Sequence, residues 1–199
     1  MSEVKTNKLT AATGTAITLG DSGDTFTVPS GTTLAVASGG TITNSGTATG
    51  FGGDNTPMFL ATSTTQQTVT NDVDTKIEFA NEIIDTDSAF DNTTNYRFTV
   101  PSGEGGKYLF QVQAAAWNSN NSGMKLAQVF IKLNGSTVTQ WSHDMRNNYG
   151  GGIGFGAPFL LDLSAADYLE VWGLMQATGT CKWYSSAIYR NSFSGFKLL

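Results

Sequence analysis

A short apolar pattern recurs along residues 9–50 with a nearly constant period. Its repeats begin at positions 9, 17, 26, 34 and 42, so successive repeats lie 8 or 9 residues apart. Turn-forming clusters separate them, at Gly20–Gly23, Pro29–Gly31, Ser38–Gly40 and Asn44–Gly46. Short extended segments that alternate with tight turns at a regular period indicate stacked β-rungs.

One copy of this segment has too few apolar residues to enclose a core. Segments below roughly 40–50 residues usually need disulfides, metals or oligomerisation to fold. Cys181 is the single cysteine, so the chain forms no disulfide within itself, and no cluster of metal ligands occurs in the segment. We therefore predict a shaft of three intertwined copies, which also pairs the exposed strand edges. Its predicted core is Ile17, Leu19, Phe26, Val28, Leu34, Val36 and Ile42. The other interpretation is a disordered Thr/Gly linker, which the regular apolar pairs disfavour.

Charge and composition exclude several classes of partner. The net charge is −5, and no run of Lys or Arg occurs, so nucleic acid is not an expected partner. No apolar run approaches the roughly 20 residues that span a bilayer, so we expect no membrane insertion. The opening residues MSEVKTNKLT lack the apolar core of a secretory signal, and we expect folding in a cytoplasm.

The remainder of the chain has the pattern of an antiparallel β-sandwich. A Gly-rich neck at 51–57 precedes a predicted head at 58–199, which holds all four tryptophans. Short β-type runs recur there without helical periodicity, and Asn134-Gly135 is a strong hairpin signal. The runs are Lys76–Phe79, Tyr96–Val100, Tyr108–Gln113, Ala127–Leu133, Val138–Trp141, Phe159–Leu163, Tyr168–Leu174, Ile188–Tyr189 and Phe193–Leu198.

Two separated motifs in this part resemble the C1q/TNF-like jelly-roll family. The first runs from Phe79 through Asp85, Phe90 and Phe98 to Gly106-Lys-Tyr-Leu-Phe110, and the second is the closing strand Ser192–Leu198. Val112 stands where the family usually has an aromatic residue. The resemblance implies a ten-stranded jelly roll, compact homotrimers and recognition without catalysis. The predicted fold class is thus all-β: a C1q-like jelly-roll sandwich preceded by a short, intertwined trimeric β-rung shaft.

A second resemblance concerns the repetitive segment, which is similar in composition to the shaft-proximal parts of structural proteins from marine bacteriophages, cyanophages especially. It implies a trimeric fibre or spike on the virion surface, released by lysis. Host-receptor binding by a tail fibre is the function this favours, and a capsid-decorating knob or spike is the alternative. The expected partners are two further copies, a host glycan or protein, and another virion protein at the N-terminus. The predicted attachment peptide, residues 1–8, begins with Met1, Ser2, Glu3, Val4 and Lys5.

Two loops combine aromatic rings, amides and glycines, which suit sugar rings or protein loops. The candidate receptor-binding residues in them are Trp117, Asn118, Asn120, Asn121, Arg146, Asn147, Asn148 and Tyr149. The other interpretation is that these are ordinary exposed turns, with Trp117 packed in a core or an interface.

No residues are predicted to be catalytic. Adjacent strand residues point to opposite faces, so Ser142-His143-Asp144 does not form a relay. No cofactor is expected. Calcium remains open because aspartates cluster at 72–74 and 85–91, but the EF-hand pattern is absent and the metal is left unknown.

Overall fold

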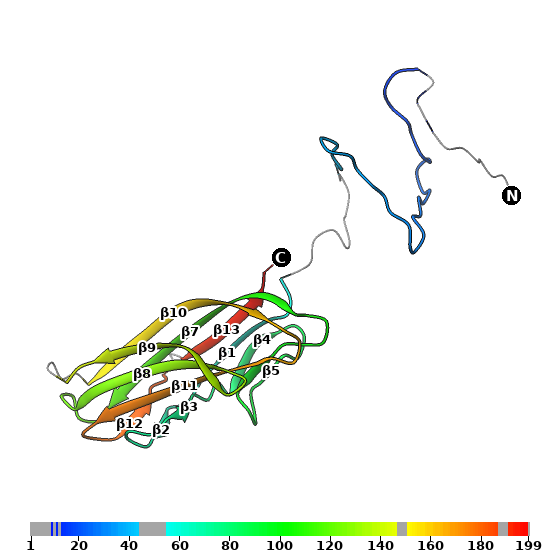
Figure 1. The fold of residues 1–199 in the computed structure, drawn as a ribbon. Helices are drawn as coiled ribbons and strands as arrows, with labels where there is room; N and C mark the ends of the chain where they lie inside the picture. Colours follow the sequence, from blue (N-terminus) through cyan, green and yellow to red (C-terminus); the bar gives the residue numbers. More distant parts are fainter. Residues whose placement is uncertain are drawn as a thin grey trace. The chain divides into compact units, whose positions relative to one another are not determined.

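The structure is a computed structural model that describes residues 9, 11, 13–43, 55–146, 151–186 and 191–198. The chain divides into two units, residues 1–49 and residues 50–199. Figure 1 shows both units, which are described separately below. No helix that could span a membrane occurs in these described ranges.

The first unit is a series of extended segments joined by tight turns. Backbone hydrogen bonds of 2.9–3.1 Å close turns at Asp21–Asp24, Pro29–Thr32 and Ala37–Gly40. The third residue of each turn is a glycine with φ between +81° and +96°, a conformation that glycine adopts without steric strain. The turns lie where the sequence predicted them, but no strand forms within the described residues 13–43. Within these residues, the predicted strands therefore do not pair with one another.

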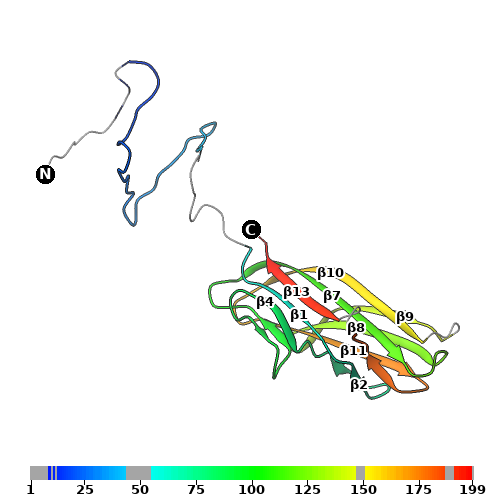
Figure 2. The ribbon, with the colours of Figure 1, turned by 180° about the vertical axis from the view of Figure 1, so that it is seen from behind.

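The described residues of the second unit form thirteen β-strands in two antiparallel sheets. The strands of the first sheet, sheet A, are β1 (Met58–Thr62), β2 (Gln67–Val69), β4 (Asn81–Asp85), β7 (Gly106–Asn118), β10 (Gly152–Leu163), β12 (Cys181–Trp183) and β13 (Ser192–Lys197). The strands of the second, sheet B, are β3 (Thr75–Lys76), β5 (Phe90–Asp91), β6 (Arg97–Thr99), β8 (Met124–Leu133), β9 (Ser136–Asp144) and β11 (Tyr168–Ala177). Figure 2 shows the unit from behind, with β10 beside β7 along one edge.

Strand pairing in sheet A joins distant parts of the sequence. The long strand β7 pairs with β10 on one side and with β12 and β13 on the other. Strand β13 also pairs with β1, so the first and last strands of the sandwich are neighbours. In sheet B, β11 lies between β8 and the short strands β3 and β6. The two antiparallel layers confirm the predicted all-β sandwich.

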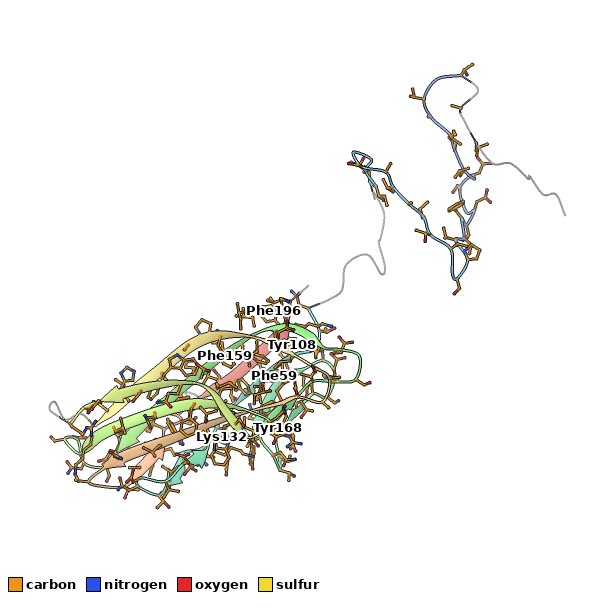
Figure 3. All side chains as sticks on the ribbon, viewed as in Figure 1. Phe59, Tyr108, Lys132, Phe159, Tyr168 and Phe196 are labelled. Carbon is orange, nitrogen blue, oxygen red and sulfur yellow. The ribbon has the colours of Figure 1, made fainter. Side chains whose placement is uncertain are left out.

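The core lies between the sheets and is rich in aromatic rings. Phe59 is 1% exposed and stacks on Phe90 and Phe98 with ring centroids 5.1 and 4.9 Å apart. Along β7, alternate side chains such as Tyr108 and Phe110 point inward, as the two-residue period of a strand requires. Figure 3 labels two of these core rings, Phe59 and Tyr108.

The close approach of the rings requires a glycine in the closing strand. A Cβ atom at Gly195 would lie 2.3 Å from Phe110 Cδ1, so only glycine leaves room for this ring. The glycine of the resemblance motif Ser192–Leu198 thus has a packing role in this chain.

Several local predictions are confirmed. The alternation of Ala127, Val129, Ile131 and Leu133 predicts one buried face for the run Ala127–Leu133; in β8 the first three are fully buried and Leu133 is partly buried. Asn134 and Gly135 have φ of +49° and +83° and form the hairpin turn between β8 and β9.

Other elements were not predicted. Strands β1, β2, β4 and β12 carry little periodic signal because each has only three to five residues. The predicted run Ile188–Tyr189 lies outside the described residues.

Candidate functional site

The two predicted binding loops meet at one end of the sandwich. The backbone N–H of Asn118 donates to the carbonyl oxygen of Gly151 over 2.8 Å, which joins the end of β7 to the start of β10. A Cβ atom at Gly151 would lie 3.1 Å from Asn121 Cα, so the two loops are in contact. The fold therefore brings Gly151, which follows the second predicted loop, beside Asn118 and Asn121 of the first, although they are distant in sequence.

Asn118 corrects the sequence analysis, because its side chain is 0% exposed rather than on a loop surface. Strand β7 continues through Asn118, so the connection to β8 begins only at Ser119. The Asn118 amide donates to Cys181 Sγ over 3.7 Å, and its Oδ1 accepts a 2.8 Å bond from the Asn120 N–H. Asn118 therefore organises the turn from inside and cannot contact a receptor.

Asn120 and Asn121 are exposed as predicted. The Asn120 amide donates to Thr178 Oγ1 over 3.3 Å, and its Oδ1 accepts a 3.2 Å bond from the Ser122 N–H. These bonds hold the loop shape. The exposed atoms of this loop are thus amide groups on a turn that is fixed by its own hydrogen bonds.

Arg146 is exposed, but its guanidinium is paired with Asp144. The Nε group donates to both carboxylate oxygens over 2.9 and 3.0 Å, and Nη2 contacts Oδ2 as well. These bonds lower the pKa of Asp144 to about 2 and raise the pKa of Arg146. The remaining predicted residues of this loop, Asn147, Asn148 and Tyr149, lie outside the described residues.

Trp117 lies on the outer face of sheet A, where it borders a shallow pocket. Its neighbours Ala116 and Asn118 point inward, and across the sheet it is paired with Gly152 of β10 and Lys182 of β12. The Tyr184 ring lies beside the Trp117 ring, with centroids 6.3 Å apart and planes tilted by 40°. The pocket has a volume of about 460 Å³ and is lined by Ala115, Ala116, Trp117, Gly152, Ile153, Gly154 and Tyr184.

A lysine side chain lies near the Trp117 ring. The Lys182 ammonium lies 5.7 Å from the centroid of the Trp117 ring and donates to Gln66 Oε1 over 3.1 Å. Tyr184 and Lys182 were not predicted as site residues. They follow Trp117 by more than sixty positions, and only the pairing of β12 with β7 brings them alongside.

The outer face of sheet B carries a tryptophan surrounded by charged side chains. Trp172 donates from Nε1 to Glu170 Oε2 over 3.0 Å, and Lys132 Nζ lies 3.9 Å from the centroid of its ring. Lys76 forms an ion pair with Glu170 at 2.6 Å, so each charge has a partner. The polar groups of this cluster therefore contact one another. Figure 3 labels Lys132 and Tyr168 on this side of the sandwich.

The histidine and the aspartate clusters serve local structure. His143 is exposed with its ring 5.0 Å from that of Phe155, while Asp144 pairs with Arg146. Asp91 accepts bonds from the N–H groups of Thr93, Thr94 and Asn95, which hold its pKa well below the usual range. In the described part of the chain, no group of three or more His, Cys, Asp or Glu side chains is placed to hold a metal ion.

Comparison with solved structures finds a similar chain, the globular domain of zebrafish complement 1qA protein. The identity is 16%, the match covers 72% of this chain and 98% of that chain, and the TM-score is 0.49. No protein-family model and no curated protein matches the sequence. The assignment of the fold therefore rests on the two antiparallel sheets and their strand order.

Proposed function

We propose that this chain is one subunit of a homotrimeric fibre or spike, with the repetitive segment as shaft and the β-sandwich as a non-enzymatic binding head. One observation carries the proposal. The seven predicted core residues of the shaft are between 40% and 65% exposed in the single chain. They are Ile17, Leu19, Phe26, Val28, Leu34, Val36 and Ile42.

The regular spacing of these exposed apolar residues is more unusual than their number. Scattered apolar residues on a surface need no explanation, but seven in one short segment at a fixed period do. Burial is favourable by roughly 25 cal/mol for each Å² of apolar surface. The β-sandwich of the same chain has no sequence repeat of eight or nine residues against which the apolar residues of the first unit could pack in register. Further copies offer the same period in register.

The backbone of the same segment supports this assembly. Between the turns, the extended residues make no ladder hydrogen bonds inside the described part of the first unit. Strand edges from further copies supply the missing donors and acceptors. Three copies give each rung three strands, which close around the apolar rows.

The head contributes recognition in this proposal. The two predicted loops connect strands of the sandwich, and loops on a folded scaffold are a common place for recognition residues, which supports this part of the proposal. Three weak sites on one assembly raise overall avidity by roughly 10²–10⁴ without any new contact. We propose a host cell-surface glycan or protein as the receptor, and the surface of a bacteriophage virion, in a tail fibre, as the setting. The attachment peptide Met1–Lys5 lies outside the described residues and is proposed to dock on another virion protein.

Native mass spectrometry of the full chain tests the assembly. We expect a mass about three times the 21.1 kDa of one chain. A monomer that stays folded at micromolar concentration would overturn the shaft. The virion setting has its own test, immunogold labelling of intact particles with an antibody to residues 58–199. Label on tail fibres supports receptor binding, label over the capsid supports decoration, and the absence of label contradicts the virion setting.

A further inference from the structure

An apolar row crosses the outer face of sheet A, over the strands that Figure 2 shows side by side. Strand pairing places Met58 of β1 opposite Phe196 of β13, and Phe196 opposite Leu109 of β7. Leu109 is in turn opposite Leu160 of β10. Their neighbours along each strand point into the core, so these four side chains point outward. Leu160 is 64% exposed, more than any other large apolar side chain in the described sandwich.

The outer face beyond this row is uncharged. The outward positions of β7 from Leu109 to Trp117, and of β10 from Gly152 to Leu160, include no Asp, Glu, Lys or Arg. At Gly154, a Cβ atom would meet nothing within 4 Å and φ is not positive, so neither packing nor backbone conformation requires glycine there. A glycine inside a strand often marks a place where another backbone approaches closely. The face therefore suits close contact with another uncharged surface.

A second copy of the same face is the partner that fits these observations. Each chain carries a net charge of −5, so identical copies associate most readily through a surface without charge. The outer face of sheet B lacks this property, because Lys132 and Lys76 lie over the Trp172 ring there. The proposed shaft also holds three chains together, which raises the effective concentration of their heads. Copies related by a closed rotation bring the same apolar row to one axis.

The repeat alone leaves the alignment of the copies ambiguous. Two sets of positions recur every eight residues: the apolar residues Phe26, Leu34 and Ile42, and the turn glycines Gly23, Gly31 and Gly39. A copy displaced by eight residues still places apolar residues beside apolar residues and turns beside turns, and it loses the contacts of only one repeat. Register is weakly specified in extended segments of this kind. Another part of the chain must therefore select one alignment.

We propose that the heads of three chains contact one another through the outer face of sheet A, and that this contact sets the register of the repeats in the shaft. The inference rests on the proposed function and gives the head a role in assembly besides recognition. Each head is joined to its own repeats by the same short segment, residues 50–57. A copy displaced by one repeat therefore carries its head with it, and its apolar row no longer meets the other two.

A fluorine label on the full chain measures the symmetry of the shaft. The label is a trifluoromethyl group attached to Thr33→Cys, an exposed position of the repeat, and Cys181 does not react because it is 1% exposed. Three copies in register are equivalent and give one fluorine NMR resonance. A displaced copy makes the three inequivalent, so several resonances appear. Native mass spectrometry of the same samples measures the number of copies.

We expect one resonance from a trimer when the outer face of sheet A is unaltered. Leu160→Asp places three charges in the contact between heads. We expect a trimer, held by the shaft, in which the original resonance falls below about half of the fluorine signal. Leu160→Lys should do the same with the opposite charge. Val73→Asp is the matched control, because Val73 is 47% exposed but lies in the turn between β2 and β3, outside the apolar row, and it should keep one resonance.

The outcomes separate this inference from the proposed function. A trimeric Leu160→Asp with a single resonance contradicts the inference and leaves the fibre standing; it is the result expected if a different partner occupies this face. Several resonances from Val73→Asp or from the unaltered face also contradict it. So does a monomeric Leu160→Asp, because the inference requires the shaft to hold the copies by itself. A monomer with the unaltered face contradicts the proposed fibre itself.

Discussion

The two units of the chain use the same kinds of residue to opposite effect. Phe26 in the repetitive segment is 65% exposed, whereas Phe59 in the sandwich is 1% exposed. The backbone hydrogen bonds in the described part of the first unit link residues three positions apart, as from Asp24 to Asp21. In the second unit, strand pairing reaches from Met58 to Phe196. The difference teaches that, among the described residues, the repeat makes local backbone contacts and leaves its apolar side chains exposed, whereas the sandwich buries them by joining distant segments.

We expect the largest effect from a charge introduced into the apolar repeat. We expect Phe26→Asp to dissociate the proposed trimer, because each copy loses about 2–3 kcal/mol of burial and gains a charge on the axis. Analytical ultracentrifugation over a dilution series measures the dissociation. Thr27→Asp is the matched control, since Thr27 lies between Phe26 and Val28 and faces the other way in an extended segment. Equal dissociation by both variants contradicts the predicted apolar row.

Within the sandwich, Gly173→Ala is expected to have a large effect on folding. The new Cβ atom would lie 2.0 Å from the Trp183 ring and 2.8 Å from the Gln128 carbonyl oxygen. Overpacking of this kind costs about 3 kcal/mol in the free energy of unfolding, measured by urea titration of the full chain. Gly156→Ala is the control, because its Cβ meets open space, and it should leave the unfolding midpoint unchanged or slightly raised. An unchanged midpoint for Gly173→Ala would show that the indole moves aside easily.

The turns of the repeat offer a smaller perturbation. Gly31 has φ of +81°, and a Cβ atom there meets nothing within 4 Å, so Gly31→Ala changes backbone strain alone. We expect a loss of about 1–2 kcal/mol per copy, seen as a higher dissociation constant of the oligomer. The unfolding midpoint of the sandwich should stay the same. A shift of the sandwich transition instead would mean that the two units do not fold independently.

The smallest expected effect concerns a single capping carboxylate of the sandwich. Asp91→Ala removes bonds to three backbone N–H groups, and we expect a loss of about 1 kcal/mol at pH 7 in urea unfolding. The pKa of Asp91 is lowered in the folded state, so its contribution is present above the ordinary value of about 4 and disappears as pH falls through the lower folded value. The difference between wild type and variant should therefore shrink below pH 4. Asp162→Ala, at an exposed ion pair with Lys107, should have almost no effect at either pH.

Much of the fold was predictable because local chemistry specifies it. The Ser-Gly turns of the repeat and the Asn134-Gly135 hairpin follow from the few residues that tolerate positive φ. The buried face of β8 follows from a two-residue alternation long enough to read. Short strands such as β1 and β12 escaped prediction because three to five residues do not establish a period.

The candidate site was predictable only in part. Trp117 was singled out for its aromatic ring among amides, and the sandwich does place it on an outer face. Asn118 was singled out with it, yet one position along a strand reverses the direction of a side chain and buries it. Tyr184 could not be found, since no spacing in the sequence links it to Trp117.

The amino-acid sequence by itself determined the secondary-structure class, the turn positions, the two-part organisation and the faces of the longer strands. These depend on backbone preference and on periods of two or eight residues, which are local properties. Tertiary structure alone decided which strands are neighbours, that Trp117 meets Tyr184 over a glycine floor, and that Asn118 is internal. Such contacts join residues far apart in the chain, and their free energy depends on the packing of the whole sandwich rather than on any short run of residues.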